Sequence, residues 1–348
     1  MGFCSDSEAK MVLTRKKLLE RFRAKDASEG GRQLYVYGCA AHYLNLVETE
    51  VTPRTVLNKV VEVQKFFRNH HQPAAWLREK GGVKPQLPNS TRWNSQDECI
   101  NTFLSNYQKL HEICSEHQEE VDRNIKAIMN NSSIHMETMH LQKQLKIVSH
   151  ALDTLQSDHC SLGDAVHVWL DMLDAHVLQP YKEVLEKRCK QCITPLHLVA
   201  YQAHPKYKGE KLSMEQDEQA NEWIQEINPE FAAPLMALSI NDQDAYPKSM
   251  LEESVTNVLP PSKWWRILGK KSSKQSKDNS SKLVTSEFCR LMEQISSLPA
   301  SSASVERLFS TFGLVHTKLR NRLGNATTEK LVMCHRTLRC PKDQCDEW

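Results

Sequence analysis

The chain has 348 residues, 40% of them hydrophobic, which is enough for about two domains with buried cores. Its 45 Lys and Arg residues nearly balance its 43 Asp and Glu residues, which excludes a general nucleic-acid binder with a whole-molecule positive field. Eleven scattered cysteines, no apolar signal segment and a mean hydropathy of −0.56 exclude a secreted disulfide framework and a membrane protein.

The first third of the chain predicts one strand followed by helices. Strand-like sequence is scarce, and the best candidate is Leu34–Tyr37, which follows a turn-forming Gly-Gly pair. A helical pattern begins at Ala40. Apolar residues at helical spacing predict another helix from Val60 to Leu77, ending at the Gly81-Gly82 break.

The middle of the chain predicts a large helical region over residues 57–260. Capping residues at 89–91 predict a helix that begins near Trp93. A later apolar seam repeats at spacings of four and three, which is typical of a helix packed in a bundle and leaves a coiled coil as an alternative. The seam consists of Leu141, Leu145, Val148, Leu152 and Leu155. A further helical pattern, Ala165–Arg188, contains Pro180, which predicts a bend or a break.

The C-terminal part predicts a loop and then more helices. Gly269–Lys282 is rich in Lys and Ser, so we expect a flexible loop that could also contact phosphates. An amphipathic run, Leu283–Leu298, follows it. Three serines between 301 and 304 can then cap a helix. The apolar residues of this helix and a later one are Val305, Leu308, Phe309, Phe312, Leu331 and Val332. Such faces either complete the core or pair with a second copy.

Several motifs occur in an order that resembles a known family. The stretch at 298–310 reads LPASSASVERLFS, and a Trp264-Trp265 pair precedes it. Upstream, 37–46 reads YGCAAHYLNL, 87–95 reads LPNSTRWNS and 193–209 contains HPKYKG. These segments resemble, in their order, the landmarks of hobo/Activator (hAT) transposases. The chain is similar to the C-terminal two-thirds of such a protein, with its dimerisation region.

The resemblance implies a mostly α fold with a small α/β remnant. Residues 1–56 would be the remnant of a truncated RNase H-like catalytic core, and 57–260 a large helical insertion. Residues 261–340 would form the helical dimerisation region, with 269–282 as its flexible loop. From Trp264 to Leu338 we expect the surface through which two or more copies associate, with the six apolar residues above at the contact.

The resemblance also implies an incomplete catalytic site. The family holds divalent metal with two aspartates and a glutamate, because hard Mg²⁺ or Mn²⁺ ions prefer oxygen ligands. CSDSEAKM at 4–11 places the second aspartate on Asp6, and the ER motif places the glutamate on Glu306. No residue takes the first role, so we expect weak metal binding and no strand cleavage. Alternatively, Glu306 only pairs with Arg307 or another surface cation.

Four residues are candidates for DNA contact. The resemblance places Cys39 and His42 near the cleaved strand, although C-x-x-H would also suit half of a zinc site with Cys189 and Cys192. Arg92 and Trp93 match an R-W motif, in which a guanidinium binds phosphate and an indole stacks on an unpaired base. Taken alone, the pair would more often be a helix-start packing element.

These expectations define one leading function and two competitors. The leading hypothesis is a transposon-derived protein that forms homodimers or higher oligomers, keeps weak DNA affinity and needs no cofactor. The resemblance places it in the nucleus. The first competitor is a fragment of an active DNA transposase whose BED zinc finger and first aspartate are missing from this sequence, and Mg²⁺ would be needed only for that complete enzyme. The second is an unrelated helical scaffold.

Overall fold

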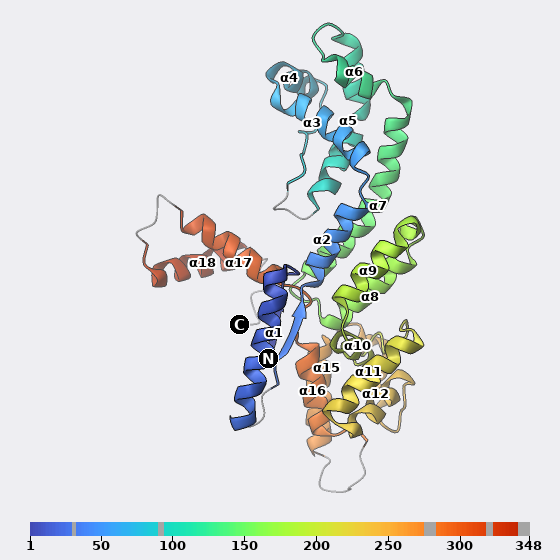
Figure 1. Cartoon of the computed structure of the whole chain (residues 1–348), viewed down its shortest axis with the longest axis vertical. Coiled ribbons are helices and arrows are strands. Elements are labelled where there is room, and N and C mark those ends of the chain that lie inside the picture. Colours follow the sequence, from blue (N-terminus) through green and yellow to red (C-terminus); the bar gives the residue numbers. More distant parts are fainter. Residues whose placement is uncertain (30–32, 90–93, 275–282, 318–322, 340–348) are drawn as a thin grey trace.

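The computed structural model describes residues 1–29, 33–89, 94–274, 283–317 and 323–339 (Figure 1). Helices make up 73% of the structure, which confirms the mostly α prediction. Two short parallel strands, β1 (Gly2–Ser5) and β2 (Tyr35–Gly38), pair with Gly2 opposite Tyr35. The predicted strand is confirmed with a shift of one residue. Neither β1 nor the helix that follows it, α1 (Ala9–Glu29), is predicted by the sequence pattern.

A first core belongs to a helical unit at one end of the molecule (Figure 1). This helical unit consists of α3 (Arg54–Asn69), α4 (His71–Glu79), α5 (Ser95–Glu116), α6 (Arg123–Met129) and the first half of α7 (Ser132–Gln156). The single helix predicted over 60–77 is wrong, because the backbone of His70 is extended and divides it. Pro73, close behind, could not donate to a continuous helix.

The long helix α7 joins this unit to a second core. Leu141 and Leu145 lie in the first core, whereas Val148, Leu152 and Leu155 lie in the second, so the predicted seam is a buried bundle face. The second core also contains α2 (Ala40–Val51), α8 (Leu162–Asp174) and α9 (Lys182–Cys192). The predicted break in the 165–188 pattern is confirmed, since the 3₁₀ turn His176–Tyr181 contains Pro180.

A third core joins the strands to the C-terminal half of the chain. Tyr35 and Tyr37 of β2 pack in one hydrophobic cluster with residues of the helices that follow α9. Its main helices are α10 (Pro195–Gln202), α11 (Met214–Ile227), α12 (Ala232–Ser239), α15 (Pro261–Lys274) and α16 (Ser286–Ser296). Three short elements, the 3₁₀ turn Pro229–Phe231, α13 (Lys248–Leu251) and α14 (Glu253–Thr256), connect them.

The expected loop over 269–282 is wrong for its first six residues. Residues 269–274 continue α15, and 275–282 lie outside the described residues. Packing explains the difference: α15 lies along α16, and the backbone at Gly269 approaches Cys289 so closely that an added Cβ would be 3.1 Å from the Cys289 Cβ. Contact with α16 therefore stabilises a segment whose composition alone favours a loop.

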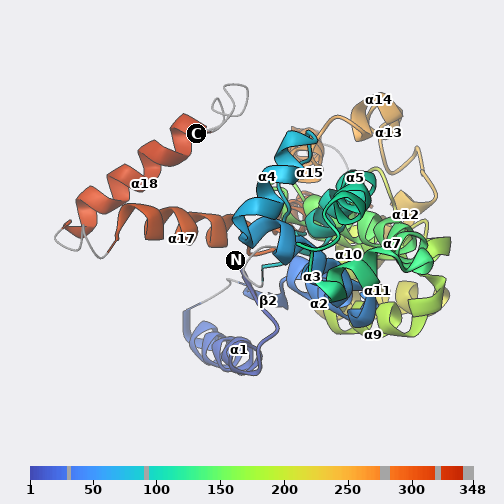
Figure 2. The same cartoon turned by 90° about the horizontal axis from the view of Figure 1, so that it is seen from above.

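The last two helices form an arm. α17 (Ala303–Val315) and α18 (Asn325–Arg339) pack against each other and project from the body as a hairpin (Figures 1 and 2). We call this hairpin the C-terminal arm. Among the described helices, none is long and apolar enough to cross a bilayer.

Candidate functional site

The strand ends, the start of α2 and the start of α17 meet at one place. Parallel pairing puts Ser5 opposite Gly38, so Asp6 and Cys39 leave the two strands side by side. The Cys39 amide donates to the Ser5 carbonyl at 2.7 Å. The Ser302 amide in turn donates to the Cys39 sulfur at 3.3 Å. Elements that carry Asp6, Cys39 and Glu306 are thus joined by direct hydrogen bonds.

The two candidate metal carboxylates each have a local partner. Asp6 accepts a hydrogen bond from the Glu8 amide at 3.1 Å, and Glu306 accepts one from the Ser302 hydroxyl at 2.8 Å. Arg307 binds Asp158, so the expected pair of Glu306 with Arg307 is wrong. In the part of the chain that the structure describes, no group of three or more His, Cys, Asp or Glu side chains could hold a metal ion.

Sequence reasoning missed Arg15, which fixes α1 against the strand ends. Its guanidinium donates to the Ser5 hydroxyl and to the Asp6 carbonyl, both at 2.6 Å, and its side chain is buried. These bonds satisfy a permanent charge that would otherwise be costly to bury. Nothing marks Arg15 in the sequence, where it is one of several basic residues of α1.

Two cysteines, the half-buried Cys4 and the buried Cys39, interact at this junction. The Cys4 thiol donates to the Cys39 sulfur, and this bond lowers the pKa of Cys39 to about 6. Burial opposes the shift, whereas the Ser302 and His42 amides add to it. The same hydrogen bond to Cys39, together with burial, raises the pKa of Cys4. The two pKa values therefore shift in opposite directions, so Cys39 loses its proton before Cys4 does.

The candidate DNA residues differ in their accessibility. Cys39 is wholly buried, so the expected DNA contact by its side chain is wrong, and its sulfur instead holds the start of α17. His42, one turn along α2, is half-buried. Arg92 and Trp93 lie outside the described residues. Cys189 and Cys192 are buried in the second core.

The C-terminal arm exposes most of its apolar residues. Phe309 is 68% exposed, Phe312 43% and Leu331 40%. Val305 and Leu314 are exposed as well, and Leu308 is half-buried. The alternative in which these side chains complete the core of the same chain is therefore wrong. An exposed apolar surface of this kind marks an interaction site.

One residue expected at the contact, Val332, and the tryptophan pair at the start of the expected region are buried within the chain. Val332 is buried where α18 packs on α17. Trp264 and Trp265 are wholly buried in the third core, where their indole nitrogens donate to the carbonyls of Met250 and Ala203 at 2.7 and 2.9 Å. An indole packs best where its N–H has a partner, and both have one here. The exposed apolar part of the expected association surface therefore lies on the C-terminal arm.

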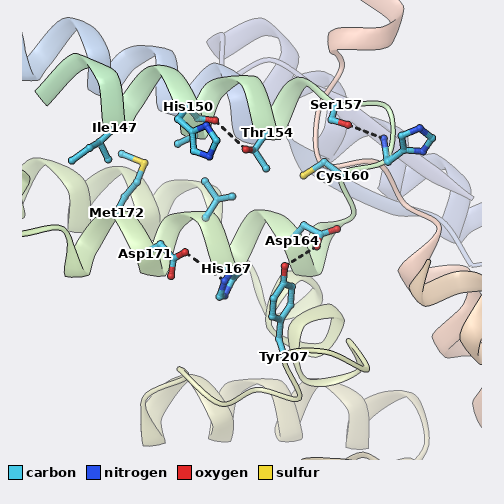
Figure 3. A pocket seen from close by; sticks show the side chains of 13 residues that line it. Ile147, His150, Thr154, Ser157, Cys160, Asp164, His167, Asp171, Met172 and Tyr207 are labelled. Atoms are coloured by element: carbon cyan, nitrogen blue, oxygen red, sulfur yellow. Dashed lines mark hydrogen bonds and ion pairs between the residues drawn. The ribbon is translucent and has the colours of Figure 1, made fainter. Parts of the chain in front are cut away.

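A cavity of about 430 Å³ lies between α7 and α8, with Tyr207 on one side (Figure 3). Asp164 accepts hydrogen bonds there from the Tyr207 hydroxyl at 3.2 Å and the Ser161 hydroxyl at 2.7 Å. Burial alone would raise the pKa of Asp164, but bonds from His204 and Ser161 outweigh it and lower the pKa to about 2. The ionised Asp164 carboxylate thus links α8 to the chain after α10 by hydrogen bonds.

Fold and surface together define a helical protein with an exposed apolar arm built for association. Residues 247–338, which run from the start of α13 to the end of the C-terminal arm, match the hAT family C-terminal dimerisation region. The chain therefore carries the dimerisation region of the hAT family, which confirms the resemblance over these residues. No curated protein matches the chain.

Proposed function

We propose that this protein is a transposon-derived hAT-type protein that self-associates through its C-terminal arm. The observation that carries the proposal is the apolar face of α17, which the described part of the same chain leaves exposed. Burying such a face against a second copy removes apolar surface from water at roughly 25 cal/mol per Å². The solution mass of the wild-type chain tests it, and we expect the mass of two or more chains.

We further propose that the strands are part of an RNase H-like sheet. Their parallel pairing and the position of Asp6 directly after β1 support this. Parallel strands are normally buried between helices, and here α1 connects the two. The family resemblance also leads us to propose that the protein acts in the nucleus.

We expect no DNA cleavage by this chain alone. A two-metal site for phosphodiester cleavage needs enough carboxylates to hold both ions, and the family resemblance assigns two carboxylates of this chain, Asp6 and Glu306, to such a site. Purified protein with Mg²⁺ or Mn²⁺ should leave a labelled duplex intact over hours. Cleavage that requires metal and disappears in Glu306→Ala would contradict the proposal, whereas cleavage that persists in this variant would indicate a contaminating nuclease.

Residual DNA binding is proposed for Arg92 and Trp93. An Arg offers charge to phosphate and a Trp a stacking surface to an unpaired base, so binding should be salt-sensitive and stronger for DNA with single-stranded ends. Trp93→Ala should weaken binding to such ends by about 1–3 kcal/mol and leave binding to blunt duplex nearly unchanged. Fluorescence anisotropy measures both, and equal loss on both DNAs would exclude stacking.

A further inference from the structure

A second cavity lies in the helical unit of the first core. Its walls are the end of α3, the start of α4 and residues 82–85, and its volume is about 500 Å³. A volume of this size is typical of small-ligand sites. In Figure 1, α3 and α4 lie towards one end of the molecule, and the strands lie near its middle. We call this cavity the basic pocket.

The charges that line the basic pocket are of one sign. Three permanent cations and two histidines line it, and none of its lining residues is a carboxylate; they are Arg68, Arg78, Lys84, His70 and His71. Within the described ranges, none of the three cations forms an ion pair. A concave surface that gathers charge of one sign concentrates the field and attracts counter-charge. An anion is therefore the expected ligand.

The backbone adds to this preference. α4 begins at His71, and its N-cap residue His70 provides no side-chain cap. The first amides of a helix have no intrahelical partner, and the helix dipole favours negative charge at this end. His70 and His71 both line the pocket, so the uncapped helix start and the three cations lie around the same cavity.

The third wall of the basic pocket is held in place. The wholly buried Asn106 exchanges two hydrogen bonds with Val83: the Val83 amide donates to Oδ1 at 2.8 Å, and Nδ2 donates to the Val83 carbonyl at 2.7 Å. Arg68 donates to the Pro85 carbonyl at 3.4 Å. Lys84 therefore stands on a fixed backbone, which reduces the entropy lost on binding.

We propose that the basic pocket binds a phosphate group. Guanidinium and ammonium groups are the side-chain groups that proteins use for phosphate, and both line this cavity beside the start of α4. Two sources share this chemistry: the backbone of a nucleic acid and free inorganic phosphate. The described residues that line the pocket lie between Phe67 and Pro85, outside the C-terminal arm, so the site is distinct from the surface proposed for self-association.

Neutralising two cations tests the proposal. Arg78→Gln with Lys84→Gln removes two charges from exposed side chains of the pocket. Lys65→Gln with Lys143→Gln is the matched control, because it changes net charge equally at exposed positions outside the pocket. In anisotropy titrations with duplex DNA, log affinity decreases with log salt. The slope of this line should be less steep in the pocket variant by about 1.8, or about 0.9 per lost phosphate contact.

A second arm uses inorganic phosphate alone, observed by ³¹P line broadening. A lost DNA slope in the pocket variant, but not in the control, supports the pocket with a nucleic-acid phosphate as ligand. Broadening that the wild type produces and only the pocket variant loses, with unchanged DNA binding, supports free phosphate. If the pocket variant matches the control with both probes, the proposal is wrong. Solution mass, measured on the same samples, reports separately on the C-terminal arm.

Discussion

Phe309→Asp should separate the copies of this protein without unfolding it. Phe309 is 68% exposed in the single chain, so a carboxylate there remains solvated in the monomer. In the associated form the same carboxylate would be buried without a partner, which costs several kcal/mol. A cost of about 3 kcal/mol weakens association about a hundredfold. Sedimentation velocity measures the association, and circular dichroism with thermal melting checks the fold.

Met136→Asp is the matched control for this variant. Met136 is 66% exposed and lies on α7, outside the C-terminal arm, so its substitution should leave both association and fold unchanged. If Phe309→Asp instead unfolded the protein while Met136→Asp did not, Phe309 would belong to the core of its own chain. Equal association of wild type and Phe309→Asp would place the interface elsewhere.

Acid should destabilise the protein through His197. Burial lowers the pKa of His197 to about 4, against about 6.5 in an unfolded chain. Its Nδ1 accepts a hydrogen bond from the Thr194 amide at 3.3 Å as part of the cap of α10, and its Nε2 has no hydrogen-bond partner among the described residues. Protonation at Nδ1 would remove this acceptor and bury a charge. His197 therefore binds a proton more weakly in the folded state than in the unfolded state.

The sign and the pH window follow from these two pKa values. Above pH 6.5 both states are neutral at His197, and below about pH 4 both are protonated. Between them the free energy of unfolding should fall by up to about 1.4 kcal/mol per pH unit, or about 3 kcal/mol in all. Urea unfolding across this range measures the loss.

His197→Gln isolates this contribution from other titrating groups. Gln also occupies this position in capping boxes, so it keeps an acceptor for the Thr194 amide but does not titrate. The wild type should lose about 3 kcal/mol relative to His197→Gln on acidification through this window. Parallel curves for the two proteins would show that His197 does not resist protonation in the folded state.

Local periodicity predicted the helices well and the contacts between distant segments poorly. The α7 seam is readable because Leu141 to Leu155 repeat at helical spacing, and β2 because LYVY gathers aromatic and β-branched residues. β1 has only Phe3 as a strong strand former, so it lacks a comparable signal. Its pairing with β2 depends on a contact across α1, which no local pattern reports.

The candidate site, too, was predictable from local motifs but not in its contacts between distant segments. Motif order assigned Asp6, Cys39 and Glu306 to one site, and the parallel register and the Ser302–Cys39 bond join the elements that carry them. It did not predict that Cys39 is wholly buried or that Arg15 reaches the strand end, since both depend on how α1 packs. The cations of the basic pocket lie at 68, 78 and 84, a spacing with no period, and only folding brings them together.

The apolar pattern of the C-terminal arm was visible in the sequence, but what covers it was not. Periodicity places Val305, Phe309 and Phe312 on α17 whether the face packs on the body or on another copy. The structure decides between these, because α17 and α18 contact each other and leave that face exposed. The pattern predicts Val332 at the contact with another copy, although Val332 is buried where α18 packs on α17. Without the partner helix, the sequence does not show on which side of α18 an apolar residue lies.

The mass of the wild-type chain in solution tests the central claim most directly. One chain has a mass of 40.0 kDa, and light scattering after size exclusion at micromolar concentration should give at least twice that value. Dilution should shift the mass towards one chain, as mass action requires for a reversible association. A mass of one chain throughout this range, with the helical content of a folded protein, would contradict self-association through the C-terminal arm.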